Sequence, residues 1–272
     1  MRAYKKLRRK WLMNRADVHI VSFPKCGRTW LCLMLGKALE HHYGLQVKNP
    51  LKLRHFKKKV KDLPLIMQHH DGGPEFKRPE ELERDKSFYS DRKVIFLVRD
   101  PRDVTVSAYY QKTKRNYNFQ GSLKEYVYHP VGSIESNIEF YNIWADQSHV
   151  PKDFLLLTYE DMHADAEKEL EKALRFVGLN EISSEDISYA VEECRFENMR
   201  RIEASNALQS KNLAPRNPQD EKTYKTREGV VGGHRKYLDS EDMEYIDRLI
   251  DKNLDDKYEF YKTQQKKGKE EI

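Results

Sequence analysis

Short apolar runs alternate with helical stretches along this chain, and this alternation limits its fold more than any other feature. Four runs have the length and the β-branched or aromatic content of buried parallel strands: residues 18–23, 65–68, 94–98 and 154–158. Helical spacing or capping residues predict five helices: residues 29–43, 100–114, 164–177, 184–194 and 239–253. We therefore expect an α/β fold: a single domain with a central parallel sheet flanked by helices. Functional loops should then lie at the carboxyl ends of the strands.

The sequence predicts one domain over residues 1–262 and a solvated tail over residues 263–272. One stretch, residues 205–233, breaks the alternation. It is polar, contains two prolines and ends in a glycine-rich run. Long irregular segments in compact domains are usually lids or binding loops, so we predict a lid loop here.

The formal net charge of +6 favours anionic partners. Nucleic acid, an anionic membrane surface and a polyphosphorylated nucleotide all fit, and so does a solvated basic surface without function. Three scattered cysteines are too few for a disulfide framework, which favours a reducing compartment, and we predict a cytoplasmic protein. Residues 1–15 are basic but hold no apolar run long enough for a signal peptide, and we expect no membrane span.

The turn between the first strand and the first helix has the composition of an anion-binding site. It reads FPKCGRTW over residues 23–30, so amides at a helix N-terminus stand beside Lys25 and Thr29. The spacing of a Walker A loop is absent, because the lysine precedes Gly27 instead of following it. The alternative is a plain strand-to-helix turn with a stray lysine.

A second basic turn follows the third strand. Arg99 ends that strand, and Ser107 lies two turns into the next helix. If the two strands are neighbours, Lys25, Arg99 and Ser107 converge on a ligand that carries phosphate at two separated positions. The alternative is that Arg99 and Arg102 simply pair with Asp100 and Asp103.

Four segments together resemble the cytosolic-type sulfotransferases, which use 3′-phosphoadenosine-5′-phosphosulfate (PAPS). PKCGRTW (residues 24–30) resembles their PKSGTTW loop, and VRDPRDVTVS (98–107) resembles their 3′-phosphate strand and helix. LTYEDM (157–162) is similar to their LxYEDM segment, and residues 227–233 resemble their late RKGxxGDW loop. The resemblance implies a P-loop-like sulfotransferase fold, PAPS as donor, 3′-phosphoadenosine-5′-phosphate (PAP) as product, and no metal.

Position by position, the resemblance implies a cofactor-binding set around the donor. The loop around the 5′ end and the 3′-phosphate site comprise Lys25, Cys26, Gly27, Arg28, Thr29, Trp30, Arg99 and Ser107. The rest of the nucleotide site comprises Tyr159, Phe196, Arg227, Glu228 and Gly229. Trp30 and Phe196 would sandwich the adenine, the alternative for both rings being plain core packing.

The resemblance also implies a histidine that removes the acceptor's proton, while Lys25 stabilises the leaving group during in-line attack. Two histidines, His69 and His70, follow the second strand. We favour His70 because His-Asp-Gly resembles the strand end of some bacterial relatives. Adjacent strand residues point oppositely, so one of the two should face the donor. A metal site is disfavoured because no further His or Cys cluster completes a ligand set.

Several positions depart from the family pattern. In the first loop, Cys26 and Arg28 replace the serine and threonine of the family. Gln68 stands where animal relatives have a lysine. In the late loop, Glu228 and His234 replace lysine and tryptophan. These departures leave the proton path open. The stretch 235–244 also lacks the core of the family's dimer motif, so the oligomeric state stays open.

Two other functions remain as alternatives. One is a P-loop-like small-molecule kinase, which the missing Walker spacing disfavours. The other is a basic protein without catalysis that docks nucleic acid or membrane through residues 1–15 and 52–61. We expect a small-molecule, lipid or saccharide acceptor and no nucleic acid. The basic stretch 48–61 favours an anionic or carbohydrate acceptor, the alternative being a solvated charged face.

Overall fold

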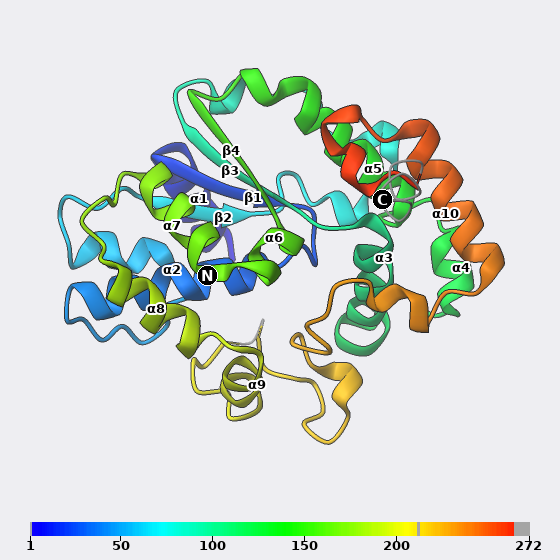
Figure 1. Cartoon of the computed structure of the whole chain (residues 1–272). Coiled ribbons are helices and arrows are strands. Elements are labelled where there is room, and N and C mark those ends of the chain that lie inside the picture. Colours follow the sequence, from blue (N-terminus) through cyan, green and yellow to red (C-terminus); the bar gives the residue numbers. More distant parts are fainter. Residues whose placement is uncertain (1, 211–212, 264–272) are drawn as a thin grey trace, which may run out of the picture.

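The fold is built on a four-stranded parallel sheet in the order β2-β1-β3-β4 (Figure 1). The computed structural model describes residues 2–210 and 213–263. The strands are β1 (Val18–Ser22), β2 (Ile66–His69), β3 (Lys93–Val98) and β4 (Asp153–Thr158). All four predicted strands are therefore confirmed, as is a single α/β domain with a central parallel sheet.

The register brings the two basic turns to one edge of the sheet. Ser22, the last residue of β1, pairs with Leu97 near the end of the neighbouring β3. Because parallel strands end at the same edge, the turns that follow Ser22 and Val98 leave the sheet side by side. Strand β1 is buried along its whole length, as expected for a central strand, whereas the edge strand β4 is half-exposed over most of its length.

Ten α-helices surround the sheet in the described part of the chain. They are α1 (Arg2–Asn14), α2 (Arg28–His42), α3 (Pro101–Tyr110), α4 (Leu123–Val127), α5 (Ile134–Asp146), α6 (Tyr159–Ala164), α7 (Ala166–Val177), α8 (Ser184–Glu193), α9 (Phe196–Ala204) and α10 (Ser240–Asn253). Each of the five predicted helices is present, with ends shifted by a few residues. Helix α3 continues as a π-helical turn, Gln111–Asn116.

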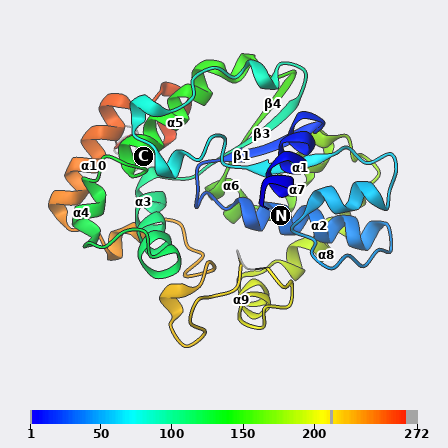
Figure 2. The same cartoon turned by 180° about the vertical axis from the view of Figure 1, so that it is seen from behind.

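Helices cover both faces of the sheet. Helices α2 and α7 pack on one face, with α8 against α2. Helix α5 lies on the other face, where its Trp144 ring stacks on Phe96 of β3 with the ring centroids 5.2 Å apart. Figures 1 and 2 show the two helical groups on either side of the strands. The buried aromatic and aliphatic side chains between these layers form one continuous core.

Local chemistry explains where two of the predicted helices begin. The helix predicted from residue 164 begins at Ala166, because Asp165 leaves the helical region and its side chain accepts a hydrogen bond from the Lys168 amide (3.0 Å). Before it lies the short helix α6. Helix α3 starts as predicted, with the Asp100 side chain accepting from the Arg102 amide and Pro101 at the first position.

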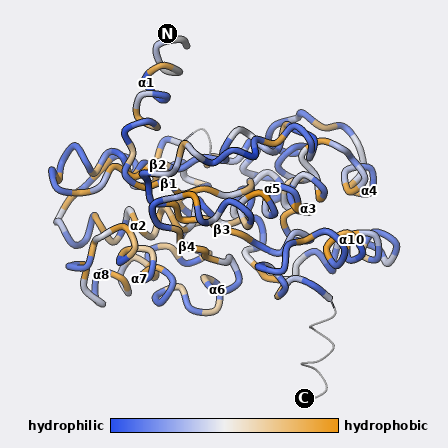
Figure 3. Tube along the Cα trace, turned by 90° about the horizontal axis from the view of Figure 1, so that it is seen from above, coloured by the Kyte–Doolittle hydropathy of each residue, from blue (hydrophilic) through white to orange (hydrophobic). Residues whose placement is uncertain are grey.

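Helices α1, α4, α5, α6 and α9 were not predicted. Figure 3 shows α1 projecting from the body of the molecule close to β2. The described residues of the segment 205–233 are irregular, as predicted, apart from the turn Glu221–Thr223 and Gly233, which begins the 3₁₀ turn Gly233–Lys236. The predicted tail, except Thr263, lies outside the described residues. Among those that are described, no helix has the length and apolar character needed to cross a membrane.

Candidate active site

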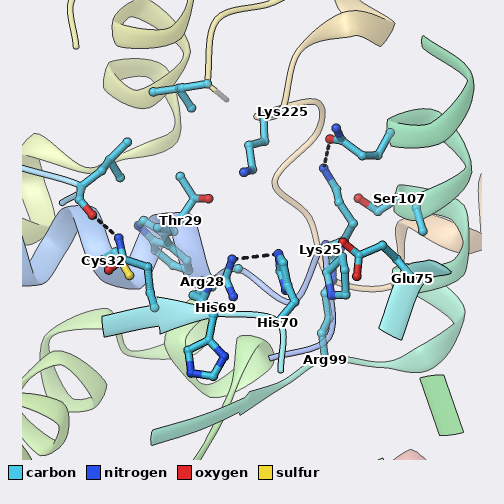
Figure 4. A pocket seen from close by; sticks show the side chains of 18 of the residues that line it. Lys25, Arg28, Thr29, Cys32, His69, His70, Glu75, Arg99, Ser107 and Lys225 are labelled. Carbon is cyan, nitrogen blue, oxygen red and sulfur yellow. Dashed lines mark hydrogen bonds between the residues drawn. The ribbon is translucent and has the colours of Figure 1, made fainter. Parts of the chain in front are cut away.

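A cavity of about 1810 Å³ opens at the carboxyl edge of the sheet, where the two basic turns meet (Figure 4). It is lined by most of the predicted site residues: Lys25, Gly27, Arg28, Thr29, Trp30, His69, His70, Arg99, Ser107, Tyr159, Phe196, Arg227, Glu228 and Gly229. These residues are far apart in the sequence. The parallel sheet and its crossovers bring them together.

The first loop is shaped by two left-handed residues. Lys25 has φ 78° and Gly27 has φ 90°. A Cβ atom on Gly27 would lie 2.6 Å from Cδ2 of Tyr159, so only glycine fits beside that ring. Helix α2 begins directly afterwards at Arg28, and the free amides of its first turn provide an N-terminus suited to an anion.

Cys26 is the one predicted loop residue whose side chain does not line the cavity. Its thiol is buried in the core and lies 3.2 Å from the hydroxyl of Tyr141. Burial raises the pKa of this thiol to about 12. The thiol is therefore a packing group, and only the backbone of Cys26 contributes to the loop.

Three cations meet in the middle of the cavity: Lys25, Arg28 and Lys225 (Figure 4). Burial and the charge of Lys225 hold the pKa of Lys25 well below its ordinary range. Burial and the charge of Arg28 lower the pKa of Lys225 to about 8. Within the described residues none of the three forms an ion pair, and Nη1 of Arg28 is buried without a hydrogen-bond partner. A bound anion would offset this concentration of positive charge.

Lys225 is brought to the cavity by a buried carboxylate on α9. The side chain of Glu203 is fully buried and accepts hydrogen bonds from the amides of Lys225 and Thr226, the latter at 2.9 Å. Glu203 also pairs with Arg115, whose Nη1 lies 3.1 Å from its Oε1. Arg115 also donates to the carbonyls of Leu213 and Thr223. Glu203 and Arg115 together therefore fix the predicted lid segment against the body.

The two arginines of the second basic turn have different surroundings. Arg99 lines the cavity, donates to Oδ2 of Asp103 (3.2 Å) and stacks its guanidinium 4.2 Å from the Tyr159 ring centroid. Its Nε is buried without a partner in the described part of the chain. Arg102 is instead buried against Asp100 and Asp247, which confirms aspartate pairing as its role. Arg99 thus pairs with an aspartate and still presents an unused donor.

Asp103 ties the end of the predicted lid to α3. It accepts hydrogen bonds from the amides of Gly232 and His234, both at 2.9 Å, and from Nδ1 of His234 at 2.8 Å. Burial alone would raise the pKa of this carboxyl, but hydrogen bonds from His234 and the charge of Arg99 hold it below its ordinary value. His234 therefore serves the loop as a buried anchor.

The two aromatic side chains predicted to sandwich the adenine, Trp30 and Phe196, both line the cavity. Trp30 is half-buried and donates from Nε1 to the Cys194 carbonyl over 3.1 Å, which fixes its ring. Phe196 lies against Gly229, where a Cβ atom would come within 2.3 Å of Cδ2 of the phenyl ring. Gly229 has φ 66°, so both its conformation and its contact require glycine.

Arg227 and Glu228 complete the late loop. The guanidinium of Arg227 lies 4.3 Å from the ring centroid of Tyr110 and donates to the hydroxyl of Tyr237 over 2.7 Å. It also pairs with Glu228 at 3.1 Å. The aromatic rings therefore hold Arg227 at the cavity wall, and Glu228 neutralises part of its charge.

The two histidines at the end of β2, His69 within the strand and His70 just after it, face different surroundings. Nδ1 of His70 donates to the Ser22 carbonyl (2.9 Å), which leaves Nε2 as the acceptor of a hydrogen bond from Nη2 of Arg28 (2.8 Å). Burial and the Arg28 charge hold the pKa of His70 well below its ordinary range, so the ring is neutral. His69 points away from Arg28 (Figure 4) and hydrogen-bonds His19 over 3.0 Å.

Comparisons with known proteins identify the family of this chain. The profile of the sulfotransferase domain matches residues 15–258, which is most of the chain. This chain belongs to the sulfotransferase family. Similar proteins include Sulfotransferase 2A1 of Homo sapiens, 26% identical over 93% of this chain and 89% of the relative. The 3-beta-hydroxysteroid sulfotransferase of Cavia porcellus is 27% identical over 92% and 88%.

Solved structures show the same fold. The sulfotransferase resembles retinol dehydratase in a complex with retinol and PAP, with a TM-score of 0.64 and 21% identity over 89% of this chain and 82% of that one. It also resembles a mouse sulfotransferase complexed with PAP, with a TM-score of 0.63 and 19% identity over 95% and 90%. The expected fold class is confirmed.

Sequence reasoning about this sulfotransferase missed Lys225 and Arg115. Lys225 lies two residues before the recognised Arg227 motif, which is the one signal that could have drawn attention to it. Arg115 lies at the end of the α3 extension without a motif of its own. The described residues contain no group of three or more His, Cys, Asp or Glu side chains suited to a metal ion.

Proposed function

We propose that this sulfotransferase moves a sulfuryl group from PAPS to an acceptor hydroxyl or amine, with His70 as the general base. One observation carries the proposal. Lys25, Arg28 and Lys225 meet beside His70 without an ion pair to any described residue, in a cavity that also holds Arg99 and Ser107. That arrangement suits a donor with negative charge at two separated positions and an acceptor that approaches between them.

The residues at hand fit the donor. Nη1 of Arg28 and Nε of Arg99 are buried donors without partners in the described chain, and Gly27 and Gly229 leave no space for a Cβ atom beside their aromatic neighbours. The α2 N-terminus, Lys25, Arg28 and Thr29 would hold the 5′ end, and Arg99 with Ser107 the 3′-phosphate. Trp30 and Phe196 would flank the adenine. PAPS, when bound, supplies the sulfuryl group.

The proton would pass to Nε2 of His70. The Ser22 carbonyl holds the proton on Nδ1, so the lone pair on Nε2 faces Arg28 and the cavity. Arg28 must share or release that lone pair when an acceptor hydroxyl arrives. An anion beside Lys25, Arg28 and Lys225 would offset their charge and raise the pKa of His70, which strengthens it as a base. Lys25 would stabilise charge on the leaving group.

Residues 205–233 would act as a lid that orders over the bound nucleotide. The segment contributes Lys225, Arg227 and Gly229 to the cavity and is anchored at Glu203 and Asp103. Limited proteolysis with and without saturating PAP tests this, because ordering should slow cleavage between the anchors. Equal cleavage rates in the two samples would contradict ordering of this segment over the nucleotide.

The acceptor would be a small molecule, lipid or saccharide, and the compartment the cytoplasm. The three cysteines support a reducing compartment, since all are buried and free. One relative is named for a hydroxysteroid, and one similar solved structure is a complex with retinol, and both of these compounds are small molecules.

The reaction itself is tested by transfer of label. The purified protein is given sulfur-35-labelled PAPS, or ATP labelled at the γ-phosphate, together with a mixture of alcohols, phenols, amines and sugars. Label that moves to an acceptor from PAPS and not from ATP supports the proposal, and Lys25→Met should abolish the transfer. Label that moves from ATP alone would favour a small-molecule kinase instead.

A further inference from the structure

One wall of the cavity carries a cluster of four cations that the donor site does not use. Arg8 and Arg9 come from α1, and Lys52 and Arg54 from the start of the 3₁₀ helix Leu53–Lys58. The proposed donor residues come from other elements, the loop after β1, α3 and the segment 225–229. Below, these four residues are called the outer cation cluster.

The outer cation cluster lies on the β2 side of the cavity, where the proposed base is. The side chain of Gln68 in β2 donates to the Leu51 carbonyl over 2.6 Å, which fixes the backbone next to Lys52. Arg9 is close enough to act electrostatically on His69, the residue before the base. An acceptor that reaches His70 from this side would pass the outer cation cluster.

Within the described parts of the chain, none of Arg8, Arg9, Lys52 and Arg54 forms an ion pair. Two buried cations elsewhere in the molecule differ, because Arg102 and Arg115 are each matched to a buried or half-buried acid. The outer cation cluster is thus a local excess of positive charge.

The cations of the outer cation cluster repel one another. Burial, and then the charges of Arg8 and Arg9, lower the pKa of Arg54. Arg9 also adds to the positive field at Arg28 in the cavity centre. Like charges that converge without an acid are unfavourable, and a bound anion removes that cost. A basic surface that serves only solubility can lie anywhere on the molecule, whereas these four side chains line the cavity that contains the proposed base.

We propose that the acceptor of this sulfotransferase carries an anionic group of its own, a carboxylate, sulfate or phosphate, that binds the outer cation cluster. The group to be sulfated would then point to His70. This inference rests on the proposed function, because it assumes that Lys25, Arg28 and Lys225 serve the donor. It assigns Arg54 and its neighbours to recognition of the acceptor.

The test uses inorganic pyrophosphate as a generic anion, titrated calorimetrically in metal-free buffer into the full chain saturated with PAP. Saturating PAP keeps pyrophosphate out of the donor site. The test variant is Lys52→Gln with Arg54→Gln. The matched control is Lys58→Gln with Lys59→Gln, which removes the same charge from the same segment at exposed positions outside the cavity wall.

We expect saturable binding to the parent protein, about tenfold weaker or more in the Lys52/Arg54 variant and within about twofold in the Lys58/Lys59 control. Equal weakening in both variants, or no saturable binding to the parent, would overturn the inference. Titration of each protein with PAP separates the two proposals. If PAP binds the parent and both variants with equal affinity, but pyrophosphate also binds all three equally, only the proposal of an anionic acceptor is wrong. If the parent does not bind PAP, the proposed function fails.

Discussion

Nη2 of Arg28 donates a hydrogen bond to Nε2 of His70 over 2.8 Å, so the atom proposed to take the acceptor's proton is held by a neighbouring cation. The Ser22 carbonyl holds the opposite nitrogen of the same ring. Where the family pattern has threonine, this chain therefore has a residue that orients the proposed base and lowers its pKa at the same time.

Replacing Arg28 by threonine should shift the pH profile of the enzyme. Burial and the Arg28 charge both lower the pKa of His70, so removing Arg28 raises it. If His70 is the base, activity requires its neutral form and is lost as the pH falls through its pKa, so the acid limb of kcat/KM should move up by about one pH unit. Arg28→Lys keeps the charge and should leave the limb nearer its original place. An unmoved limb in Arg28→Thr would contradict His70 as the base.

Two glycines of the late loop offer a matched pair of variants. Gly229 and Gly232 both have positive φ, 66° and 75°, so alanine at either position should cost about 1–2 kcal/mol of stability. A Cβ atom on Gly229 would also meet the Phe196 ring at 2.3 Å, whereas none of the described atoms lies within 4 Å of one on Gly232. PAP affinity should fall about tenfold in Gly229→Ala and stay within about twofold in Gly232→Ala. Equal affinities would remove Phe196 from the nucleotide site.

Lys225 should make PAP binding depend on pH above neutrality. Its pKa is lowered to about 8 by burial and by Arg28, so in the free enzyme it loses its charge as the pH rises through that value. PAP is anionic, and its affinity should therefore weaken between about pH 7 and 9. Lys225→Arg keeps its charge over this range and should flatten the profile. A profile that is the same in both proteins would place Lys225 outside the donor site.

His19 should make the fold sensitive to acid. Burial lowers its pKa to about 4, whereas a histidine in the unfolded chain titrates near 6.5. Below that value the unfolded state binds more protons, so stability falls as the pH drops from 6.5 towards 4 and then levels off. Between pH 7 and pH 5 this single group should cost about 2 kcal/mol of unfolding free energy. Denaturant unfolding measures the free energy of unfolding at pH 7 and at pH 5. The difference between the two values should be smaller by that amount in His19→Asn than in the parent protein. An equal difference in both proteins would count against buried, neutral His19 as the cause.

The sheet and the helices that pack on it by one face could be predicted because their periodicity is local. Helix α5 was missed because it is buried almost all round, with Ser136 and Asn137 inside among its apolar residues, and this obscures the helical pattern. The preference for His70 over His69 rested on the resemblance of His-Asp-Gly to the strand end of some bacterial relatives, and alternation along β2 predicted only that one of the two faces the donor. That His69 pairs with His19 on the neighbouring strand could not be read from residues fifty positions apart.

The position of Lys225 depends on contacts that no local pattern encodes. Its amide is held by Glu203 of α9, and that carboxylate is placed in turn by Arg115 from the end of the α3 extension. Segments without periodicity take their shape from such long-range pairs. The motifs around the donor were readable because the backbone conformation at Gly27 and Gly229 demands particular residues at fixed spacing.

The most direct test of the central claim is calorimetric titration of the protein with PAP in metal-free buffer, with ATP as the comparison ligand. Arg99→Ala removes a proposed 3′-phosphate contact, and Arg248→Ala, an exposed arginine paired with Glu244, is the control. We predict saturable PAP binding that is about tenfold weaker or more in Arg99→Ala, unchanged in Arg248→Ala, and no comparable binding of ATP. Equal binding of ATP and PAP, or PAP binding unaffected by the loss of Arg99, would contradict the assignment of this cavity to the sulfuryl donor.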